Sequence, residues 1–340
     1  MFRLPVIQIE QESMWVMHKK RFSGFRKYVF RHLLRLLFLL AGITFLSFVM
    51  MGLAGSDVVL QQMEGRGTVL SQELIDQARA ELGLDRPMIL QYLSWLGNLC
   101  RGDLGTSYVS GQGVFSVFVS KLPATLLLAG VSMALTMVIS VPLGILAAVK
   151  KNRFVDQLIR VCSFVGSSLP NFFLALLFLY VFSIRLNMFP VISREKKLES
   201  VILPALTLAG AMSSRYISQV RAAVLDEFGK EYITGIMARG VPFRRILWNS
   251  VFRGALPSLI ALFSLSFGSL LGGTAIVESI FMWDGVGKLA VDAMKMRDYP
   301  VIQAYVLWMA VIYTGVNLMA DLVSGILDPR IRLGGTADED

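Results

Sequence analysis

The chain has 340 residues, of which 55% are hydrophobic and 17% are charged, and its formal net charge at pH 7 is +9. A soluble domain usually carries about a quarter charged residues, so this composition excludes an ordinary soluble protein and favours a membrane protein. The basic excess does not indicate a nucleic-acid reader, because the Lys and Arg residues punctuate apolar runs instead of forming one patch. The two cysteines, Cys100 and Cys162, belong to no Cys/His cluster that would hold a metal ion.

Six apolar segments are each long enough to cross a bilayer, which takes about 20 residues of helix. They are predicted at residues 36–55, 124–149, 158–184, 201–220, 256–281 and 301–326. The first run is longer than the apolar core of a cleavable signal peptide, so we interpret it as a membrane anchor. The expected fold is an all-α membrane protein with six transmembrane helices.

The positive charges predict the orientation of these helices. With a cytoplasmic N-terminus, the segments on the cytoplasmic side hold 21 of the 33 Lys and Arg residues, as the positive-inside rule requires. The C-terminus is then cytoplasmic as well. This orientation divides the chain into a basic N-terminal segment 1–35, a membrane domain 36–326 with an external loop 56–121 and a cytoplasmic segment 221–255, and a tail 327–340.

The external loop is expected to contain one helix, at residues 71–84, where apolar residues recur with helical spacing. Charged residues in this loop and after the fifth span are interpreted as a solvated face. They are Asp103, Asp284, Asp292, Lys295, Arg297 and Asp298.

The cytoplasmic segment predicts two helices joined by a turn. The first runs from about residue 221 to 239, because Val224, Phe228, Tyr232 and Ile236 recur every four residues and form one apolar stripe. Gly240 ends this helix, since glycine tolerates the left-handed backbone found at helix ends.

The second helix of this segment begins at Pro242, because proline suits the first turn of a helix. It carries Phe243, Ile246, Leu247 and Val251 on one face and leads through Pro257 into the fifth span. The unit is too small to bury both apolar faces by itself. Either it packs under its own transmembrane bundle, or it docks into a groove of a cytosolic partner.

Polar and small residues interrupt the spans at two places. Ser167, Ser168, Pro170 and Asn171 break the third span, and the simplest interpretation is a kink whose freed carbonyls are satisfied by the serines. In the fifth span, Gly268, Gly272 and Gly273 favour close packing of helices over gating.

Two acids fall inside predicted spans, where ionisable residues are costly and are functional candidates. Glu278, near the outer end of the fifth span, either forms an ion pair with Lys288 or Arg297 or faces an external vestibule. Asp321, near the inner end of the sixth span, is expected to pair with a cytoplasmic arginine.

The segment EYITGIMARGVPFRRILWNSVFRGALPSL resembles the cytoplasmic EAA signature of binding-protein-dependent ABC importer permeases, in the form used by the dipeptide, oligopeptide and nickel branch. The matching residues are Glu231, Tyr232, Ala238, Arg239, Gly240, Leu256 and Pro257. The sequence departs from the pattern at Ile236 and Met237, where the branch usually has Ala-Arg.

The resemblance continues along nearly the whole chain after residue 25. It includes LGLDRPMILQYLSWLGNLCRGDLGTSY in the external loop, SLPNFF in the third span, GGTAIVESIFMWDGVGKLAVDAMKMRDYPVIQ and the final LDPRIR. Asp284 stands where the branch normally has proline.

The resemblance implies a type I ABC importer permease fold in a multi-pass protein of the bacterial plasma (inner) membrane, moving peptides, nickel or a metal chelate. It implies a homologous second permease, two cytosolic ATPases that bind ATP and Mg, and an extracytoplasmic solute-binding protein. No cofactor is expected in this chain. No GxxxxGK[ST] motif occurs, and the nearest approach, Gly285 to Lys288, lacks the rest of a phosphate cradle.

The resemblance also assigns site residues. Those expected to couple to the ATPases are Glu231, Tyr232, Ala238, Arg239, Gly240, Pro242, Phe243, Leu256 and Pro257. Candidates for the translocation path are Ser167, Ser168, Pro170, Asn171, Gly272, Gly273 and Glu278, and candidates for contact with the binding protein are Asp103, Asp284, Arg297 and Asp298.

Two other classes of function fit the sequence less well. A self-sufficient channel or secondary transporter would need a charged ion site at the midplane of discontinuous helices, and the sequence shows no convincing site of that kind. An intramembrane enzyme is disfavoured because the GxSxG and HExxH motifs and a pair of catalytic aspartates are missing.

Overall fold

The computed structural model describes residues 36–53, 85–191 and 198–327, together with positions 34, 76, 77 and 80. The chain divides into two compact units, Met1–Ala54 and Gly55–Asp340. The first unit contributes a helix at Leu36–Leu53, which agrees with the first predicted span. The expected helix at 71–84, the N-terminal segment and the C-terminal tail fall almost entirely outside the described residues.

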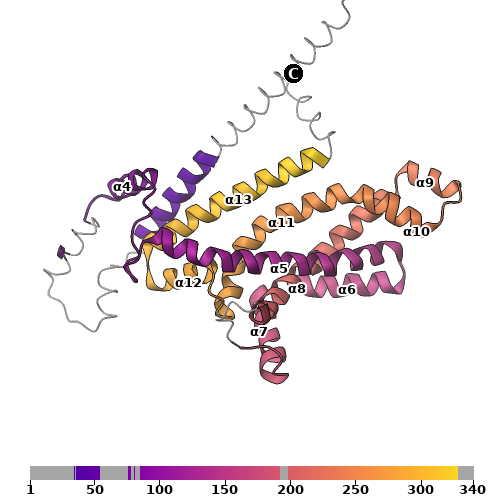
Figure 1. The fold of residues 1–340 in the computed structure, drawn as a ribbon, viewed down its shortest axis with the longest axis horizontal. Coiled ribbons are helices and arrows are strands. Elements are labelled where there is room, and N and C mark those ends of the chain that lie inside the picture. The colour runs from indigo at the N-terminus through magenta and orange to yellow at the C-terminus, as the bar shows by residue number, and fades with distance from the viewer. Residues whose placement is uncertain are drawn as a thin grey trace, which may run out of the picture. The chain divides into compact units, whose positions relative to one another are not determined.

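The described part of the second unit is built from helices, with one isolated bridge between Thr106 and Gly113. In chain order these are α4 (Met88–Cys100), α5 (Val114–Val149), α6 (Phe154–Ser168), α7 (Asn171–Phe178), the π-helix η1 (Leu179–Arg185), α8 (Leu198–Phe228), α9 (Glu231–Ala238), α10 (Phe243–Ile246), the π-helix η2 (Leu247–Phe252), α11 (Arg253–Ile280), α12 (Val286–Met296) and α13 (Tyr299–Leu327) (Figure 1).

Helix α8 organises the core of this unit, since it contacts α5, α6, α7 and α11. Buried apolar side chains such as Leu128, Leu203 and Val224 belong to one continuous cluster. Gly144 on α5 lets the two longest contacting helices approach closely, because a Cβ there would lie 2.6 Å from the Cβ of Val220 on α8. The core is therefore one closely packed cluster to which several helices contribute.

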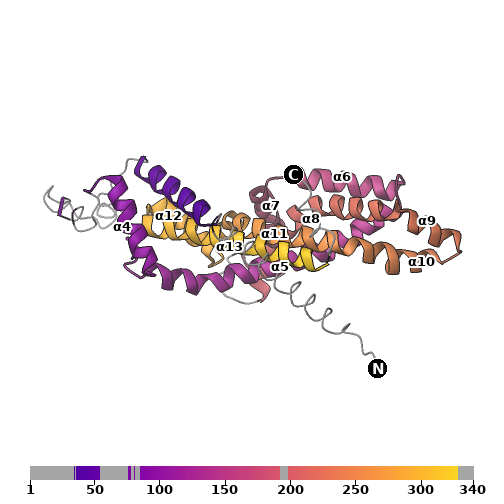
Figure 2. The same ribbon diagram turned by 90° about the horizontal axis from the view of Figure 1, so that it is seen from above.

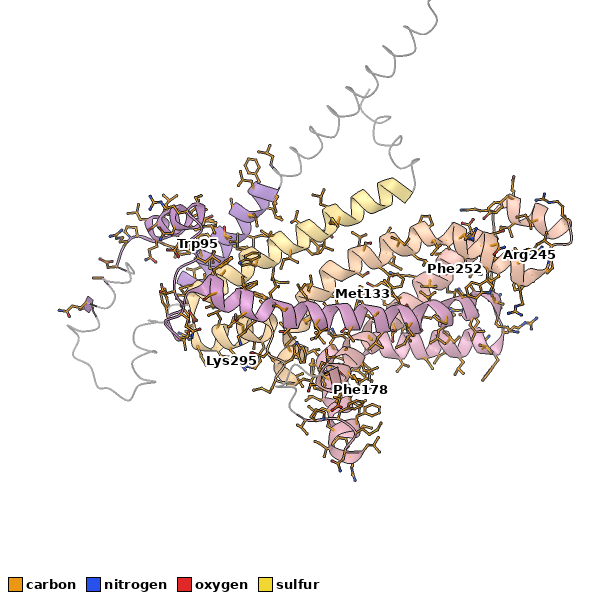
Figure 3. The ribbon with its side chains drawn as sticks, viewed as in Figure 1. Trp95, Met133, Phe178, Arg245, Phe252 and Lys295 are labelled. Carbon is orange, nitrogen blue, oxygen red and sulfur yellow. The ribbon has the colours of Figure 1, made fainter. Side chains whose placement is uncertain are left out.

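The second unit has two distinct ends. Helices α9 and α10 and the turn between α5 and α6 lie at one end, and α4 and α12 lie at the other (Figures 1 and 2). Figure 3 marks the two ends with Arg245 and Lys295. We call them the hairpin end and the α12 end. This arrangement agrees with the sequence-based orientation, which places residues 221–255 and 282–300 on opposite sides of the membrane.

The helices of the structure differ in extent from several of the predicted spans. Among the described residues, four helices are long and apolar enough to span a membrane, or five if a bent pair counts as one span. Helix α8, which contains the predicted fourth span, is not one of them because its second half is rich in serine, glutamine and arginine. Helix α5 begins at Val114, inside the segment predicted as external loop.

The third span is broken as the sequence predicts, but more sharply than a kink. Helix α6 ends at Ser168, and the axis turns by 101° before α7 and η1. The hydroxyls of Ser167 and Ser168 each donate to the carbonyl of Phe164 at 2.9 Å, so the serines satisfy a carbonyl at the break. Leu169 adopts an extended backbone, which is the conformation preferred before proline.

Candidate functional site

The hairpin, residues 231–252, turns at Gly240. Its φ angle is +74°, in the left-handed region that side chains other than glycine and asparagine rarely adopt. The carbonyl of Pro242 then accepts hydrogen bonds from the amides of Arg245 and Ile246 at 2.9 and 3.1 Å, which begins α10. The predicted turn and the start of the second helix are thus confirmed.

One face of the hairpin is buried in the bundle. Ile233 on α9 and Ile246 on α10 are 0% and 2% exposed, and Val251 on η2 is fully buried. These side chains belong to the same cluster as Val224 on α8. The hairpin therefore does pack under its own bundle, as one of the two sequence-based interpretations holds.

The predicted single helix over 221–239 is wrong. Helix α8 ends at Phe228, and α9 begins separately at Glu231. The break changes the phase of the apolar stripe, so that Ile233 is buried while Tyr232 is 45% exposed. Periodicity alone missed this break because the four-residue spacing continues across it.

A buried carboxylate holds this break together. Glu227 on α8 is 4% exposed, and it accepts hydrogen bonds from the Tyr232 hydroxyl and, at 2.5 Å, from the Lys230 ammonium. A Cβ at Gly254 on α11 would overlap the Glu227 carboxylate. Glu227 thus joins α8, α9 and α11 at a single point.

Sequence reasoning missed Glu227, although one signal was present. It follows Val220 and Val224 at helical spacing, and both valines are fully buried. An acid on such a stripe must find partners within the protein.

The hydroxyl of Tyr232 is a permanent donor at neutral pH. Burial together with the neighbouring Glu227 carboxylate raises the pKa of Tyr232 to about 12. The tie between α8 and α9 is therefore insensitive to physiological changes of pH.

The other face of the hairpin is exposed. Tyr232, Met237, Phe243 and Trp248 are between 44% and 50% exposed. Two of these rings are held by neighbours: Phe243 stacks on Phe228 with centroids 6.0 Å apart, and Trp248 meets Phe252 edge-on at 5.4 Å. Phe243 was predicted to share one face with Ile246, Leu247 and Val251, but those three are buried whereas Phe243 is exposed.

Exposed arginines surround these apolar groups. We define the exposed hairpin face as Tyr232, Met237, Arg239, Phe243, Arg244, Arg245 and Trp248. Aromatic residues, methionine and arginine are the types enriched in protein interfaces. Glu231 and Ala238 are also exposed, whereas Leu256 and Pro257 lie partly buried in α11.

The candidate path residues fall into three environments. Ser167 lines a groove between α6 and α8, and Ser168, Pro170 and Asn171 are exposed at the break beside it. Gly272 and Gly273 are exposed on α11, with nothing within 4 Å of a Cβ built on either. The packing interpretation therefore fails for these two glycines within the described chain.

Gly268 does behave as a packing contact. A Cβ there would lie 3.2 Å from the ring of Tyr313 on α13. Close helix approach is thus used one turn before the exposed pair Gly272 and Gly273.

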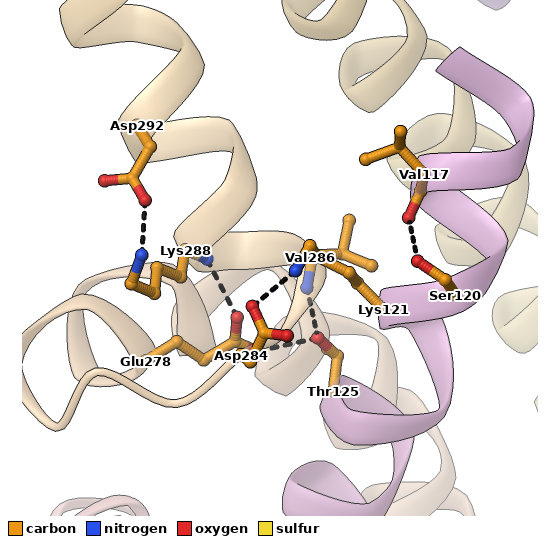
Figure 4. A network of polar contacts seen from close by, with 9 residues as sticks. All are labelled: Val117, Ser120, Lys121, Thr125, Glu278, Asp284, Val286, Lys288 and Asp292. Atoms are coloured by element: carbon orange, nitrogen blue, oxygen red, sulfur yellow. Dashed lines mark hydrogen bonds and ion pairs between the residues drawn. The ribbon is translucent and has the colours of Figure 1, made fainter. Parts of the chain in front are cut away.

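Glu278 is fully buried in a polar network at the α12 end (Figure 4). Its carboxylate accepts hydrogen bonds from the Thr125 hydroxyl at 2.8 Å and from the backbone amide of Lys288 at 2.9 Å. The predicted ion pair with Lys288 is wrong, since the Lys288 ammonium pairs with Asp292 at 2.5 Å instead. Glu278 fastens α11 to α5 and α12.

Neighbouring groups complete this network. Thr125 accepts a hydrogen bond from the amide of Val286 at 2.8 Å, and the Trp283 indole donates to the carbonyl of Ala124 at 3.0 Å. A Cβ at Gly285 would lie 2.5 Å from side-chain oxygens of both Glu278 and Thr125, which is too close for any residue larger than glycine. The segment after α11 is therefore packed tightly onto α5.

The expected external contact residues differ in exposure. Asp103 is exposed, and its carboxylate accepts a hydrogen bond from the amide of Gly105 at 2.8 Å. Asp284 is partly exposed and pairs with Lys121 at 2.5 Å. Arg297 is partly buried and takes a left-handed backbone, φ 54°, where α12 ends.

Asp298 does not belong to a solvated face, which corrects the prediction. It is 3% exposed, and its carboxylate accepts hydrogen bonds from the Ser107 hydroxyl and, at 3.0 Å, from the amide of Tyr108. Burial, and secondarily Asp298, raises the pKa of Tyr108 above its usual value. Asp298 anchors the segment before α5 to the start of α13. Asp321 is on α13, but its side chain is not among those that the structure describes, so its expected pairing with a cytoplasmic arginine stays a prediction.

The fold is that of a multi-pass membrane protein, with several helices of membrane length and one sharply broken span. At one end, its hairpin leaves apolar side chains exposed. Family models match most of the chain: "Binding-protein-dependent transport system inner membrane component" over residues 140–333, and its N-terminal component over residues 25–129. The chain belongs to this family of plasma-membrane permeases, which confirms the resemblance noted in the sequence.

Characterised relatives match over nearly their full length. The oligopeptide transport system permease protein AppB of Bacillus subtilis is 38% identical over 314 residues, covering 89% of this chain and 98% of the relative. The metal-staphylopine import system permease protein CntB of Staphylococcus aureus is 30% identical, covering 91% and 99%. The glutathione transport system permease protein GsiC of Escherichia coli K12 is 34% identical, covering 78% and 87%.

The fold also resembles a solved structure. The inward-facing MetNI methionine ABC transporter matches with a TM-score of 0.52 and 16% identity, covering 63% of this chain and 97% of that chain. This likeness supports the type I importer permease fold. The chain is therefore a permease subunit of an ABC importer, and the channel or secondary-transporter alternative is not favoured.

Proposed function

We propose that this permease moves peptides or metal chelates inward and is driven by two cytosolic ATPases that dock on the exposed hairpin face. The observation that carries the proposal is the two-sided hairpin. Ile233 and Ile246 are buried in the bundle, while the exposed hairpin face offers apolar, aromatic and basic groups to a partner. A force applied to that face is passed directly to the buried one.

The path of this force follows from the helix order. Helix α10, η2 and α11 are consecutive, so the chain runs in helical conformation from Phe243 to Ile280. The Glu227 carboxylate links the same region to α8 and α9. Displacement of the hairpin therefore moves the fifth predicted span, and ATP with Mg is bound and hydrolysed by the partner subunits.

A homologous second permease is part of the proposal. Gly272 and Gly273 present open backbone on α11, and small residues, which let backbones approach closely, are enriched in contacts between membrane helices. A path enclosed by two permeases, with α6 and α11 on its border, needs fewer helices from each chain than a self-contained channel.

An extracytoplasmic solute-binding protein delivers the cargo at the α12 end. Asp103 and Asp284 are the exposed acids at that end which remain candidates for this contact. Arg297 is a weaker candidate because it is partly buried, and Asp298 acts as an internal anchor.

The cargo class follows from the relatives. AppB, CntB and GsiC are named for oligopeptides, metal-staphylopine and glutathione. Peptides and amino-carboxylate metal chelates share amide or amine groups and free carboxylates. We therefore propose this chemistry for the cargo of the present chain.

A charge placed on the exposed hairpin face tests the coupling. Met237 is 44% exposed and makes no ring contact, so Met237→Asp changes the surface with little effect on the fold. We expect about tenfold less ATPase subunit to co-purify with the permease when it carries Met237→Asp. ATP-driven peptide uptake by that importer should fall by a similar factor.

The matched control is Val109→Asp. Val109 is 43% exposed in the segment before α5, at the α12 end, and its substitution is expected to leave ATPase retention unchanged. Full retention and full uptake by the Met237→Asp complex would refute docking at this face. Uptake by the purified permease without any ATPase would refute an ATP-driven importer.

A further inference from the structure

A groove of about 1000 Å³ runs between α6 and α8. Its lining contains four hydroxyls, two amides and two guanidinium groups, with two apolar side chains between them. These residues are Gln157, Arg160, Val161, Ser163, Phe164, Ser167, Ser214, Arg215, Ser218 and Gln219.

The groove has a fixed width because the two helices are joined at both of its ends. At one end, a Cβ on Gly166 would overlap the hydroxyl of Ser214, so the backbone of α6 lies directly against the Ser214 side chain. At the other end, Arg221 forms a two-point ion pair with the buried Asp156, with N–O distances of 2.7 and 2.8 Å. Gly166 and Asp156 are ten residues apart, or about 15 Å along α6.

The groove is rich in hydrogen-bond donors and positive charge. Neither Arg160 nor Arg215 forms an ion pair with a carboxylate in the described ranges. Asp156, the acid at the end of the groove, already engages both of its oxygens with Arg221. The two guanidinium groups are thus available to an anion.

A buried hydroxyl points to the same kind of ligand. Ser163 is 4% exposed and lines the groove, and within the described part of the chain its Oγ has no hydrogen-bond partner. Buried polar atoms are usually paired. An oxyanion in the groove would accept from this hydroxyl and from the arginines together.

Arg215 is exposed and lies towards the hairpin end of α8, 17 residues after Leu198. A guanidinium on a permease helix faces water, lipid headgroups or protein, and not the hydrocarbon of the bilayer. Hydroxyls and amides on both walls agree with an aqueous surface, and Ser167 at its edge is one of the candidate path residues.

We propose that this groove is a subsite of the translocation path that binds a carboxylate of the cargo. Arg215 and Arg160 hold the oxyanion, since a planar guanidinium can donate two parallel hydrogen bonds to a carboxylate, and Ser163 donates a further one. The inference rests on the proposed function and assigns the cargo group that this chain itself recognises.

The test compares a peptide with its amide. The probes are tetra-alanine and tetra-alanine amide, with uptake measured in proteoliposomes holding the complete importer, ATP and saturating binding protein. In the Arg215→Gln complex we expect uptake of the free acid to fall about tenfold and uptake of the amide to fall less than about twofold. Because the binding protein is unchanged, the altered acid-to-amide ratio reports on this chain.

Three further variants sharpen the result. Arg215→Lys keeps the charge but loses the two parallel donors, and it is expected to keep only part of the preference for the acid. Arg160→Gln is expected to lower the ratio as well, and it serves if the Arg215→Gln complex does not assemble. Arg101→Gln removes an exposed arginine outside the groove, after α4, and is expected to leave the ratio unchanged.

An unchanged acid-to-amide ratio in both groove variants would overturn the inference while leaving the proposed function intact. So would loss of a co-purifying anionic phospholipid from Arg215→Gln without a change in ratio, because the groove would then hold a lipid phosphate. Absence of ATP-dependent uptake of both peptides by the unmodified importer would instead refute the proposed peptide import, and the inference with it.

Discussion

The two ends of the second unit treat their polar and apolar groups in opposite ways. At the α12 end, the carboxylates of Glu278 and Asp298 are buried and receive hydrogen bonds from α5, from the segment before it and from α12. At the hairpin end, Tyr232, Met237, Phe243 and Trp248 remain between 44% and 50% exposed. The buried carboxylates at the α12 end tie its own segments together, whereas the exposed aromatic, methionine and arginine side chains of the hairpin are of the types enriched in contacts with another polypeptide.

The largest effect is expected from a substitution that distorts the turn of the hairpin, because it tests whether the exposed hairpin face transmits motion. Gly240 has a φ of +74°, and proline is fixed near −65°. We expect Gly240→Pro to leave the transmembrane helices inserted and to lower ATP-driven uptake by at least about tenfold, because the hairpin no longer presents one continuous face. Uptake and ATP hydrolysis measured on the same proteoliposomes check this uncoupling.

Gly240→Asn is the matched control for this variant. Asparagine tolerates the left-handed backbone better than other residues with a side chain, and no atom lies within 4 Å of a Cβ at this position. We expect Gly240→Asn to retain most of the uptake. Equal uptake by the proline and asparagine variants would show that the shape of the turn does not matter for coupling.

The α12 end is expected to respond in stability instead of coupling. Glu278→Ala leaves the Thr125 hydroxyl and the Lys288 amide without their acceptor in a buried site. We expect the free energy of unfolding to fall by about 3 kcal/mol, measured as a lower thermal midpoint of the purified protein.

A nearby surface pair provides the control for Glu278. Asp292 pairs with Lys288 within α12 and is partly exposed, so Asp292→Asn is expected to change the unfolding free energy by less than about 0.5 kcal/mol. If both variants unfold at the same midpoint, the buried network is not what stabilises this end.

The sequence predicts the hairpin end better than the α12 end, for a physical reason. The turn at Gly240 and the start at Pro242 depend on backbone preferences that are encoded locally, as does the break at Pro170 in the third span. The contact between Ser107 and Asp298 joins residues 191 positions apart, and no local pattern encodes it. Asp298 was therefore predicted to be solvated and is in fact buried.

Local patterns also fail where two of them compete. The apolar spacing from Val224 to Ile236 favours one helix, whereas Gly229 and Lys230 interrupt it because Glu227 gains two donors by the break. The same holds at α5, where Pro123 lies inside the helix and packing overrides the usual effect of proline. Tertiary partners decide both cases.

A smaller loss of stability than that of Glu278→Ala is expected at Tyr232, where the exposed hairpin face is hydrogen-bonded to the buried carboxylate of Glu227. Tyr232→Phe removes this hydrogen bond but leaves Lys230 in place, so we expect a loss of about 1 kcal/mol in unfolding free energy. Coupling of ATP hydrolysis to uptake should change little, since the phenyl ring keeps the apolar contact.

The pH dependence of stability separates this hydrogen bond from simple packing. The pKa of Tyr232 is raised from 10.0 to about 12, so the folded protein holds this proton more tightly than the unfolded chain. The resulting stabilisation is fully present below pH 10 and is lost as the pH rises from 10 towards 12. Thermal midpoints across this range should therefore fall more steeply for the unmodified protein than for Tyr232→Phe. Other tyrosines titrate equally in both proteins, so parallel curves would mean that the hydroxyl of Tyr232 does not join α9 to α8.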